Sequence, residues 1–501
     1  MHHKDIKRII KKQLKSQYPN WKRLKRKIKK AIAKEVLKEV TATYDFTNTI
    51  TIPKEDLLGI EEQAPTHGII SIQDMAKYIN KVNESSIVRY NSYKRSPIYI
   101  KDEELRYIDK LLDDGILKRI LAYDGYNPSL HDVFPVNMFR AELLKAIKYP
   151  EISYRKFCTE EYLGLDRKQN RVFCGLSLSE KTMIDHTQLC KFRSNLTFVQ
   201  QVNLMVYILH HFNQSGLLGD NVIHGIDSTE LASDCKLPLA TLKIKGKKIR
   251  IYNDIDCDCG RRRNKRDKSV YVIGYRLHTL TAIDAKTGHS FPLISLLSPA
   301  NHHDSHFLPF VVNLAQAMGI NMQLITADEA YHDKDGSLFD KTKVVVTTPP
   351  SSQVLLPDNV NSETGKVFCH ENCLIPMKHL GVNEQEHEYK CNADQGECSH
   401  CSSCSQGRFI PVDRGLFQKI PYHTPGLQQA HDIRKNCERP FNLLKNQTGM
   451  ENVRVRSQHA TMARCTLASI AVLLIKMAGT RQKQPSLVPK QKEMFKMKKA
   501  A

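Results

Sequence analysis

A chain of 501 residues is too long for one compact core, so we expect it to fold into two to four domains. Hydrophobic residues make up 41% of it, which excludes a mostly disordered protein. The formal net charge of +22 favours a polyanionic partner, with nucleic acid as the first hypothesis. A basic surface that only keeps the protein soluble, or one that meets an anionic membrane, is the alternative.

The basic charge is concentrated at the N-terminus, where residues 1–40 hold fifteen Lys or Arg and three acidic residues. Apolar residues recur at helical spacing on both sides of Pro19, which predicts two amphipathic basic helices. These helices could lie along a DNA backbone; a solvated charged face or a flexible basic arm is the alternative. We assign 1–100 as a basic DNA-binding region and 101–215, which is rich in helix-forming residues, as a helical domain.

From residue 216 the sequence changes to short runs rich in β-branched and aromatic residues, which predict five strands. A predicted helix at 305–318 separates the third run from the fourth, so we expect an α/β domain with a mixed sheet over 216–350. A cysteine-rich insertion at 351–425, two closing helices within 426–480 and a basic tail at 481–501 follow. The five runs are 222–227, 270–284, 291–298, 322–328 and 343–349.

Compartment and membrane association are predicted from the apolar runs and the cysteines. The basic N-terminal residues are not followed by an apolar segment, so we expect no signal peptide. The longest apolar run, 465–475, is shorter than the roughly 20 residues that span a bilayer, so we expect a buried core helix and no membrane partner. Fourteen cysteines without an export signal favour reduced thiols or metal ligands, which predicts a cytoplasmic protein.

Three carboxylates stand where the predicted elements could bring them together. Asp227 and Asp328 each end a predicted strand, and Glu438 lies in a predicted helix that could pack beside those strand ends. Oxygen ligands of this kind suit Mg²⁺ or Mn²⁺, and a pair of such ions can stabilise the attacking and leaving oxygens of a phosphoryl transfer. Taken singly, an Asp after a strand is more often a loop or capping residue.

The predicted helix around Glu438 carries basic residues on the same face. At 100° per residue, His431, Arg434 and Lys445 fall within about 60° of it. Such a face fits a surface that grips phosphate groups, whereas a solvated face with an Arg434–Glu438 pair is the alternative. Pro440 lacks a backbone N–H and could kink the helix before Lys445.

Six stretches together resemble the DDE transposases of prokaryotic insertion sequences, in the group with a tyrosine-x2-Arg-x3-Glu-x6-Lys signature. Arg434, Glu438 and Lys445 match this signature, while His431 stands in place of the tyrosine. Members of this group tend to carry an insertion between the second Asp and the Glu, where 351–425 falls. The stretches lie at 185–193, 224–231, 274–278, 298–311, 326–331 and 434–445, so the resemblance covers most of the chain.

The resemblance implies an RNase H-like catalytic domain in which Asp227, Asp328 and Glu438 ligate Mg²⁺ or Mn²⁺. Arg434 and Lys445 would hold the DNA backbone near the scissile phosphate. The implied enzyme cleaves the ends of its insertion sequence and joins them to target DNA. It would act in the prokaryotic cytoplasm, at the nucleoid, as a homodimer assembled on DNA. A nuclease of the same fold without strand transfer and a catalytically silent DNA-binding protein are the alternatives.

Six cysteines of the insertion are spaced as in a metal site, with the last three forming C-x2-C-x2-C. Short-spaced pairs separated by a loop let thiolates close a tetrahedral zinc site, but the spacing does not show which four would bind. Free thiols and an iron–sulfur cluster are the alternatives, although Arg408 stands where a ferredoxin-like run would need another cysteine. The cysteines are Cys369, Cys373, Cys391, Cys398, Cys401 and Cys404, with His370, His379 and His400 as further possible ligands.

The segment 257–268, between the first two predicted strands, carries six basic residues from Arg261 to Lys268, including Arg262 and Arg263. We predict a loop that could clamp DNA beside the metal site. A solvated hairpin loop is the alternative.

Overall fold

A computed structural model describes most of the chain. The described residues are 3–21, 24–43, 68–84, 97–122, 133–219, 222–244, 247–263, 269–331, 337–349, 357–361, 364–370, 373–383, 386–392, 407–411, 424–450 and 455–483.

The chain divides into two compact units, each made of segments far apart in the sequence. The first contains Met1–Gly68, Gly219–Asn442 and Glu451–Met462, and the second contains Ile69–Leu218, Leu443–Met450 and Ala463–Ala501. This division differs from the predicted one, because the segment 1–100 is split at residue 68 and the segment 426–480 contributes to both units.

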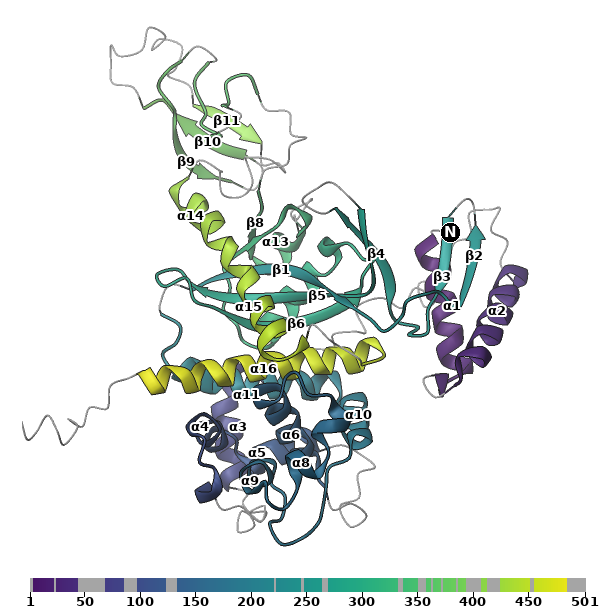
Figure 1. Cartoon of the computed structure of the whole chain (residues 1–501). Helices are drawn as coiled ribbons and strands as arrows, with labels where there is room; N and C mark the ends of the chain where they lie inside the picture. Colours follow the sequence, from purple (N-terminus) through teal and green to yellow (C-terminus); the bar gives the residue numbers. More distant parts are fainter. Residues whose placement is uncertain are drawn as a thin grey trace, which may run out of the picture. The chain divides into compact units, whose positions relative to one another are not determined.

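A mixed six-stranded sheet forms the centre of the first unit (Figure 1). Its strands run in the order β4-β5-β1-β7-β8, with β6 also paired to β5. Strands β1, β5 and β6 are antiparallel neighbours, whereas β1, β7 and β8 are parallel. The predicted fold class, a mixed sheet flanked by helices, is confirmed. The strands are β1 (Val222–Ala232), β4 (Asp258–Arg263), β5 (Ser269–Asp284), β6 (Ser290–Pro299), β7 (Leu324–Ala327) and β8 (Val345–Thr347).

Both faces of this sheet are covered. The predicted helix at 305–318 corresponds to a short 3-10 turn, η7 (Asp304–His306), and to α12 (Leu308–Ala317), which packs on β6. The helix α13 (Ser337–Thr342) precedes β8. On the other face, α14 (Pro425–Arg434) packs on β7 and β8, and α15 (Glu438–Asn442) packs on β6 (Figure 1).

The continuous helix predicted around Glu438 is interrupted twice. A 3-10 turn, η9 (Lys435–Cys437), separates α14 from α15, and a π-helical turn, η10 (Leu443–Gln447), follows Asn442. The uniform rotation of 100° per residue therefore does not hold between His431 and Lys445. The continuous helical face that grouped Lys445 with Glu438 is therefore absent, and Lys445 belongs to the second compact unit.

The two predicted N-terminal helices are present, and they share a core with a hairpin that the sequence did not reveal. The helices are α1 (His3–Gln17) and α2 (Arg26–Thr43), and the hairpin is β2 (Ala240–Ile244) with β3 (Lys247–Ile251). Apolar side chains from both segments bury one another. The shared core contains Ile10, Leu14, Trp21, Ala33, Val36, Leu37, Leu239, Ala240, Ile249, Ile251 and Ile255.

Three lysines at four-residue spacing on α1 are bound by the segment that follows β3. Lys7 pairs with Asp258, and Lys15 pairs with Asp256 at 2.5 Å. The Lys11 ammonium donates to the Asp256 carbonyl at 3.2 Å. We predicted DNA binding from the basic residues of the N-terminus, but these three lysines bind the segment 256–258 of the same chain.

The insertion contains a small three-stranded antiparallel sheet in the order β11-β10-β9. Its buried face carries Tyr389 and Ile410, which pack against Cys369, Cys373 and Met377. The strands are β9 (Lys378–Val382), β10 (Glu386–Lys390) and β11 (Arg408–Pro411).

The second unit is helical, as predicted for 101–215. Several of its helices begin at residues that cap free backbone amides: Asp102 accepts from Leu105 N, and Asp113 accepts from Gly115 and Ile116 N. The helices are α3 (Ile72–Glu84), η5 (Pro97–Tyr99), α4 (Glu103–Leu111), α5 (Asp114–Leu121), α6 (Pro135–Lys148), α7 (Tyr154–Phe157), α8 (Glu160–Leu163), α9 (Lys168–Cys174), α10 (His186–Asn195) and α11 (Phe198–Gln214).

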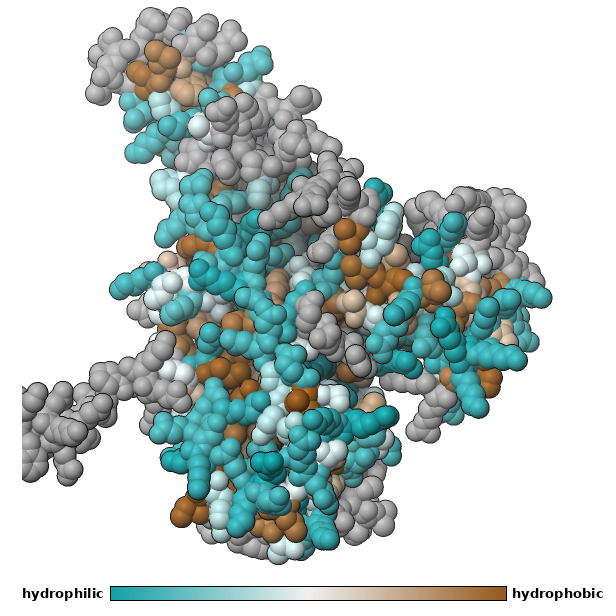
Figure 2. All heavy atoms as spheres, viewed as in Figure 1, coloured by the Kyte–Doolittle hydropathy of each residue, from teal (hydrophilic) through white to brown (hydrophobic). Residues whose placement is uncertain are grey.

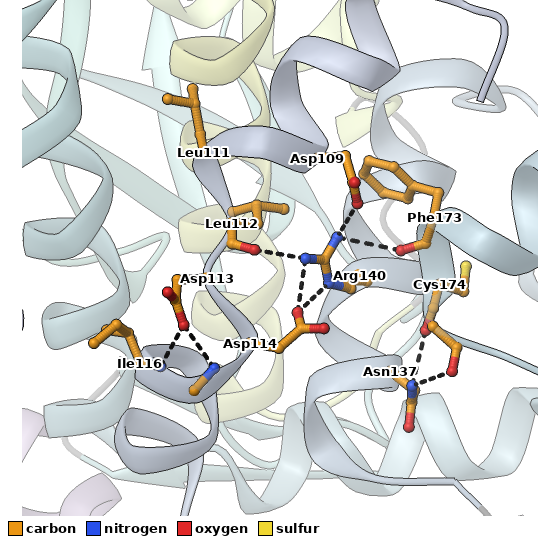
Figure 3. Close-up of polar contacts among 12 residues, drawn as sticks. Asp109, Leu111, Leu112, Asp113, Asp114, Ile116, Asn137, Arg140, Phe173 and Cys174 are labelled. Carbon is orange, nitrogen blue, oxygen red and sulfur yellow. Dashed lines mark hydrogen bonds and ion pairs between the residues drawn. The ribbon is translucent and has the colours of Figure 1, made fainter. Parts of the chain in front are cut away.

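Arg140 on α6 joins three segments of this helical unit (Figure 3). Its guanidinium lies 2.8 Å from Asp109 and 2.7 Å from Asp114, and it donates to the carbonyl oxygens of Leu112 and Phe173 at 2.7 Å and 3.3 Å. The side chain is completely buried. Because both carboxylates are also largely buried, the cluster is stable only while the guanidinium is present.

Replacing Arg140 by Met should therefore destabilise the helical unit by about 3–5 kcal/mol, because two buried carboxylates lose their partner. Faster hydrogen exchange of the α6 amides and a lower melting temperature would report the loss. Arg155→Met, at an exposed site of α7, is the control. Equal stability of the two variants would contradict the structural role of Arg140.

The last helix, α16 (Gln458–Lys483), includes the apolar run that was predicted to be a core helix. Within it, Gln458–Gly479 is long and apolar enough to cross a membrane, and 83% of this segment's most apolar window is buried in the structure.

Candidate active site

Asp227 and Asp328 come from neighbouring parallel strands. The β1–β7 register pairs Gly225 with Thr326 and Ile226 with Ala327, so the next residue along each strand is one of the two aspartates. Residues opposite each other in a parallel pair point to the same face of the sheet. The structure thus brings together the two aspartates that the sequence predicted.

Each aspartate uses one carboxylate oxygen to bind the backbone that follows it. Asp227 Oδ1 accepts from Ser228 N at 2.7 Å, and Asp328 Oδ1 accepts from Glu329 N at 2.8 Å. Among the described residues, no hydrogen bond reaches the second oxygen of either carboxylate. The two side chains are therefore oriented by their own backbone and keep one oxygen each for a further ligand.

Glu438 is brought to the same face by a close contact between a strand and the 3-10 turn η9. Gly225 lies two residues before Asp227, on the same face of β1. A Cβ atom at Gly225 would lie only 2.1 Å from Cys437 Sγ, so η9 approaches the strand at a distance that only glycine allows. Glu438 follows Cys437 directly and is exposed.

The electrostatics of Asp227 show that the three carboxylates are near one another. The pKa of Asp227 is raised to about 6, chiefly by burial; the charges of Asp328 and Glu438 also raise it, whereas Ser228 N and Arg434 lower it. Like charges held together raise a carboxyl pKa because both cannot easily ionise. Such a cluster is typical of a cation site or a catalytic centre.

Two residues of α14 that the sequence grouped with Glu438 are Arg434 and His431. Arg434 ends α14, and its charge acts on Asp227 and Cys437, so it lies beside the carboxylates as predicted. His431 is half-buried, and burial lowers its pKa. Figure 2 shows largely hydrophilic side chains over α14 and α15 on the face in view.

The segment 258–263 is a strand, β4, and not the start of the loop predicted at 257–268. The reason is that 258–263 pairs with the first residues of β5, which extend beyond β1. Arg261 is exposed on this strand. Arg262 and Arg263 belong to the same strand, but their side chains lie outside the described residues, as do 264–268.

A second basic surface lies on α2. Five exposed cations fall within about 120° of one another on this helix, along one edge of its buried side. We call this set the α2 basic face, and it consists of Arg26, Lys27, Lys30, Lys34 and Lys38. It is the described part of the N-terminal region that can meet a polyanion.

The insertion brings Cys369, His370 and Cys373 together. Their possible ligand atoms all lie within 4.8 Å of one another, and both cysteines are buried. Two thiols and an imidazole are typical zinc ligands, so this cluster could hold a zinc ion. Cys391 is half-buried and packs against the same core, whereas Cys398, Cys401, Cys404 and His400 lie outside the described residues.

His379 is not in this group: its Nε2 lies 3.1 Å from His387 Nδ1 on the neighbouring strand β10.

If the cluster holds zinc, purified protein should contain close to one zinc ion per chain, and Cys369→Ser and Cys373→Ser should lose it. The insertion should also become more sensitive to proteases, because a structural zinc site contributes folding free energy. Elemental analysis and limited proteolysis measure both effects, with Cys190→Ser at an exposed thiol as control. Zinc-free wild-type protein with a protease-resistant insertion would contradict a structural zinc site.

Several residues around the carboxylates were not identified from the sequence. Gly225 and Cys437 lie far apart in the sequence and meet only in the folded protein, so no spacing pattern in the sequence predicts their contact. In another part of the same unit, the segment 254–258 reads D-x-D-x-D, and its Asp256 and Asp258 pair with Lys15 and Lys7, which stand at multiples of four-residue spacing on α1. That pair of patterns was visible in the sequence and could have predicted the contact.

No protein-family model matches this sequence, and no curated protein matches it. A comparison with solved structures finds a similarity to the cryo-EM structure of a piggyBac transposase synaptic complex with hairpin DNA. The sequences are 13% identical, the match covers 80% of this chain and 84% of that chain, and the TM-score is 0.24. A TM-score this low does not establish a shared fold.

Proposed function

We propose that this protein is a DNA transposase of the DDE type, which cleaves the ends of an insertion sequence and joins them to target DNA. The observation that carries the proposal is the meeting of Asp227, Asp328 and Glu438 on one face of a mixed sheet. The proposal is also supported by the resemblance of the six sequence stretches, which include all three carboxylates. An RNase H-like character of the sheet domain is part of the proposal.

The donor set fits a divalent metal ion. Three carboxylates supply hard oxygen ligands, and Arg434 is the cation that acts on Asp227 from within the cluster. When bound there, Mg²⁺ or Mn²⁺ would activate the attacking hydroxyl and stabilise the leaving oxygen of a phosphoryl transfer. The protein itself would orient the carboxylates through the amides of Ser228 and Glu329.

Basic residues would bind the DNA and supply its position. Arg434 lies beside the carboxylates and would contact a phosphate next to the reacting one. The α2 basic face, Arg261 and Lys445 would bind phosphates farther along the duplex, where contacts position DNA without reading its sequence. A homodimer assembled on DNA in the prokaryotic cytoplasm, at the nucleoid, completes the proposal.

The test is cleavage and joining with the wild-type protein, Mg²⁺, DNA that carries the element's ends and a target plasmid. We expect cut ends and joined product. Cutting without joining, even when free 3′-hydroxyl ends are supplied, would favour the RNase H-like nuclease. DNA binding that does not depend on Mg²⁺ and leads to no cutting would favour the catalytically silent DNA-binding protein.

The raised pKa of Asp227 gives a separate prediction for the metal-free protein. The carboxyl of Asp227 has a pKa of about 6 in the folded protein, against an ordinary value of 3.8, so the folded state favours its protonated form. Its contribution to stability is therefore complete below pH 3.8 and is lost as the pH rises through 6. Asp227→Asn should therefore stabilise the metal-free protein at pH 8 by roughly 1–3 kcal/mol, and the gain should vanish near pH 4.

Thermal melting in EDTA from pH 4 to pH 8 measures this difference, with Asp432→Asn at an exposed site of α14 as control. Addition of Mg²⁺ at pH 8 should raise the melting temperature of the wild type and leave Asp227→Asn unchanged. A variant less stable than wild type in EDTA at pH 8 would contradict a cluster of repelling carboxylates.

A further inference from the structure

A buried polar network lies on the face of the sheet opposite Glu438. Along β1, Asp227 points to the face that η9 covers, so Ser228 points to the other face. The β1–β5 register pairs Ser228 with His278, which is completely buried and stacks on Phe307 with a ring-centroid distance of 4.5 Å. None of these side chains has a part in the proposed metal site.

Tyr331 is the end of this network that lies nearest to Asp328. Its amide donates to the Asp328 carbonyl at 2.9 Å, which closes the 3-10 turn η8 (Glu329–Tyr331). The phenol is completely buried, and its oxygen lies 2.7 Å from His278 Nδ1. The turn that orients the Asp328 carboxylate is therefore held by a buried side chain on the opposite face.

One tautomer of His278 satisfies both of its partners in this network. Ser298 Oγ can donate to the carbonyl of Pro299 at 3.3 Å, so it accepts from His278 Nε2 at 2.9 Å. Burial lowers the pKa of His278 to about 3, and the ring is neutral, so Nδ1 accepts from the Tyr331 hydroxyl. Removal of that hydroxyl would leave a buried imidazole nitrogen without its donor.

The network also reaches the segment that carries Asp227. Ser228 Oγ donates to Asp304 Oδ2 at 3.2 Å, and Asp304 pairs with Arg276 at 2.7 Å. Burial raises the pKa of Tyr331 well above its ordinary value, the charge of Asp304 also raises it, and the neighbouring Ser228 hydroxyl opposes the rise. Ser228 and Tyr331 therefore lie side by side, one directly after Asp227 and the other three residues after Asp328.

We propose that Tyr331 is a positioning residue, which holds the turn after Asp328 against Ser228 and His278 and so keeps Asp227 and Asp328 at the spacing that a divalent cation requires. The two carboxylates repel each other, so their own interaction cannot hold them together. We call Ser228, His278 and Tyr331 the brace. It acts from the face of the sheet opposite Glu438 and leaves the face with the carboxylates free for DNA. This inference depends on the proposed function, because it assigns a role toward the same metal.

The test compares Tyr331→Phe with Tyr275→Phe in the full chain. Both tyrosines are buried, and each substitution removes a hydroxyl that forms a buried hydrogen bond, since Tyr275 OH donates to Asp254 at 2.6 Å. The probe is Mn²⁺ alone, whose binding is measured by electron paramagnetic resonance with and without DNA. We expect Tyr331→Phe to weaken Mn²⁺ binding by about 10- to 100-fold, as is usual for residues that orient metal ligands. Tyr275→Phe should bind Mn²⁺ like wild type.

Cleavage assays add a second readout that a general loss of stability would not produce. In Tyr331→Phe the Mn²⁺ concentration for half-maximal cleavage should rise about tenfold or more, with a smaller change in the maximal rate. If Tyr331→Phe fails to fold, Ser228→Ala serves as the second variant and should also weaken Mn²⁺ binding.

Mn²⁺ binding and cleavage by Tyr331→Phe that equal those of wild type would overturn the positioning role, while the proposed function stands. An equal effect of Tyr275→Phe would also overturn it. If wild type and Asp227→Asn bind Mn²⁺ equally, or wild type never cuts DNA, the proposed function itself fails.

Discussion

Asp227→Asn, Asp328→Asn and Glu438→Gln should each lower DNA cleavage by about 1000-fold or more, while DNA binding stays within about twofold of wild type. A 1000-fold loss corresponds to about 4 kcal/mol of transition-state stabilisation. Amides keep the size of the carboxyl group but lose the negative charge that holds a divalent cation. The fold should survive, because within the described part of the chain these three side chains form no buried ion pair.

The measurement is single-turnover cleavage of DNA carrying the element's ends, with binding followed in parallel by fluorescence anisotropy. Glu329→Gln is a matched control, because Glu329 is exposed and directly follows Asp328. Only its backbone amide contacts the carboxylate of Asp328. Variants that cut as fast as wild type would show that the three carboxylates do not carry the chemistry. Loss of both binding and cutting would point to a structural role instead.

Much of the sheet could be predicted from the sequence because its strands are local patterns. All five predicted runs are strands, and the helix predicted between the third and fourth runs is present as α12. The hairpin β2–β3 and the strand β4 were missed for the same physical reason. Their residues are basic and polar on one side, and they are stabilised by partners distant in the sequence, α1, α2 and the start of β5.

Asp227 and Asp328 could be found from the sequence because each ends a recognisable strand, and Glu438 could be found because it matches a sequence signature together with Arg434 and Lys445. The geometry of the helix that carries Glu438 could not, since a 3-10 turn and a π turn replace the continuous helix. A constant rotation of 100° per residue, applied over the fourteen residues from His431 to Lys445, placed Lys445 on the same helical face as Glu438. Because the 3-10 turn and the π turn change that rotation, this placement does not hold. The brace of Ser228, His278 and Tyr331 was likewise invisible, because it depends on strand register and burial.

Gly225→Ala should be the most damaging small substitution outside the carboxylates. Alanine is normally as good as glycine or better within a strand, because it has less conformational freedom to lose. Here the new Cβ would lie 2.1 Å from Cys437 Sγ, while its other nearest neighbours, Ile283 Cδ1 and Thr326 Cγ2, lie at 3.2 Å and 3.4 Å. The clash therefore pushes η9 away from β1, and Glu438 moves with it.

A displacement of about 1 Å in a reacting group can cost about 100-fold in rate, so we expect Gly225→Ala to lower cleavage by that factor with DNA binding unchanged. Cys437→Ala removes the sulfur and should by itself have little effect, since Cys437 lies in an apolar contact with Ile283 and Ile433. The double variant Gly225→Ala/Cys437→Ala should recover most of the lost rate. The double variant can recover activity only if the Cys437 sulfur is what the new methyl group strikes. If the double variant cleaves DNA no faster than Gly225→Ala, the Gly225–Cys437 contact does not set the position of Glu438.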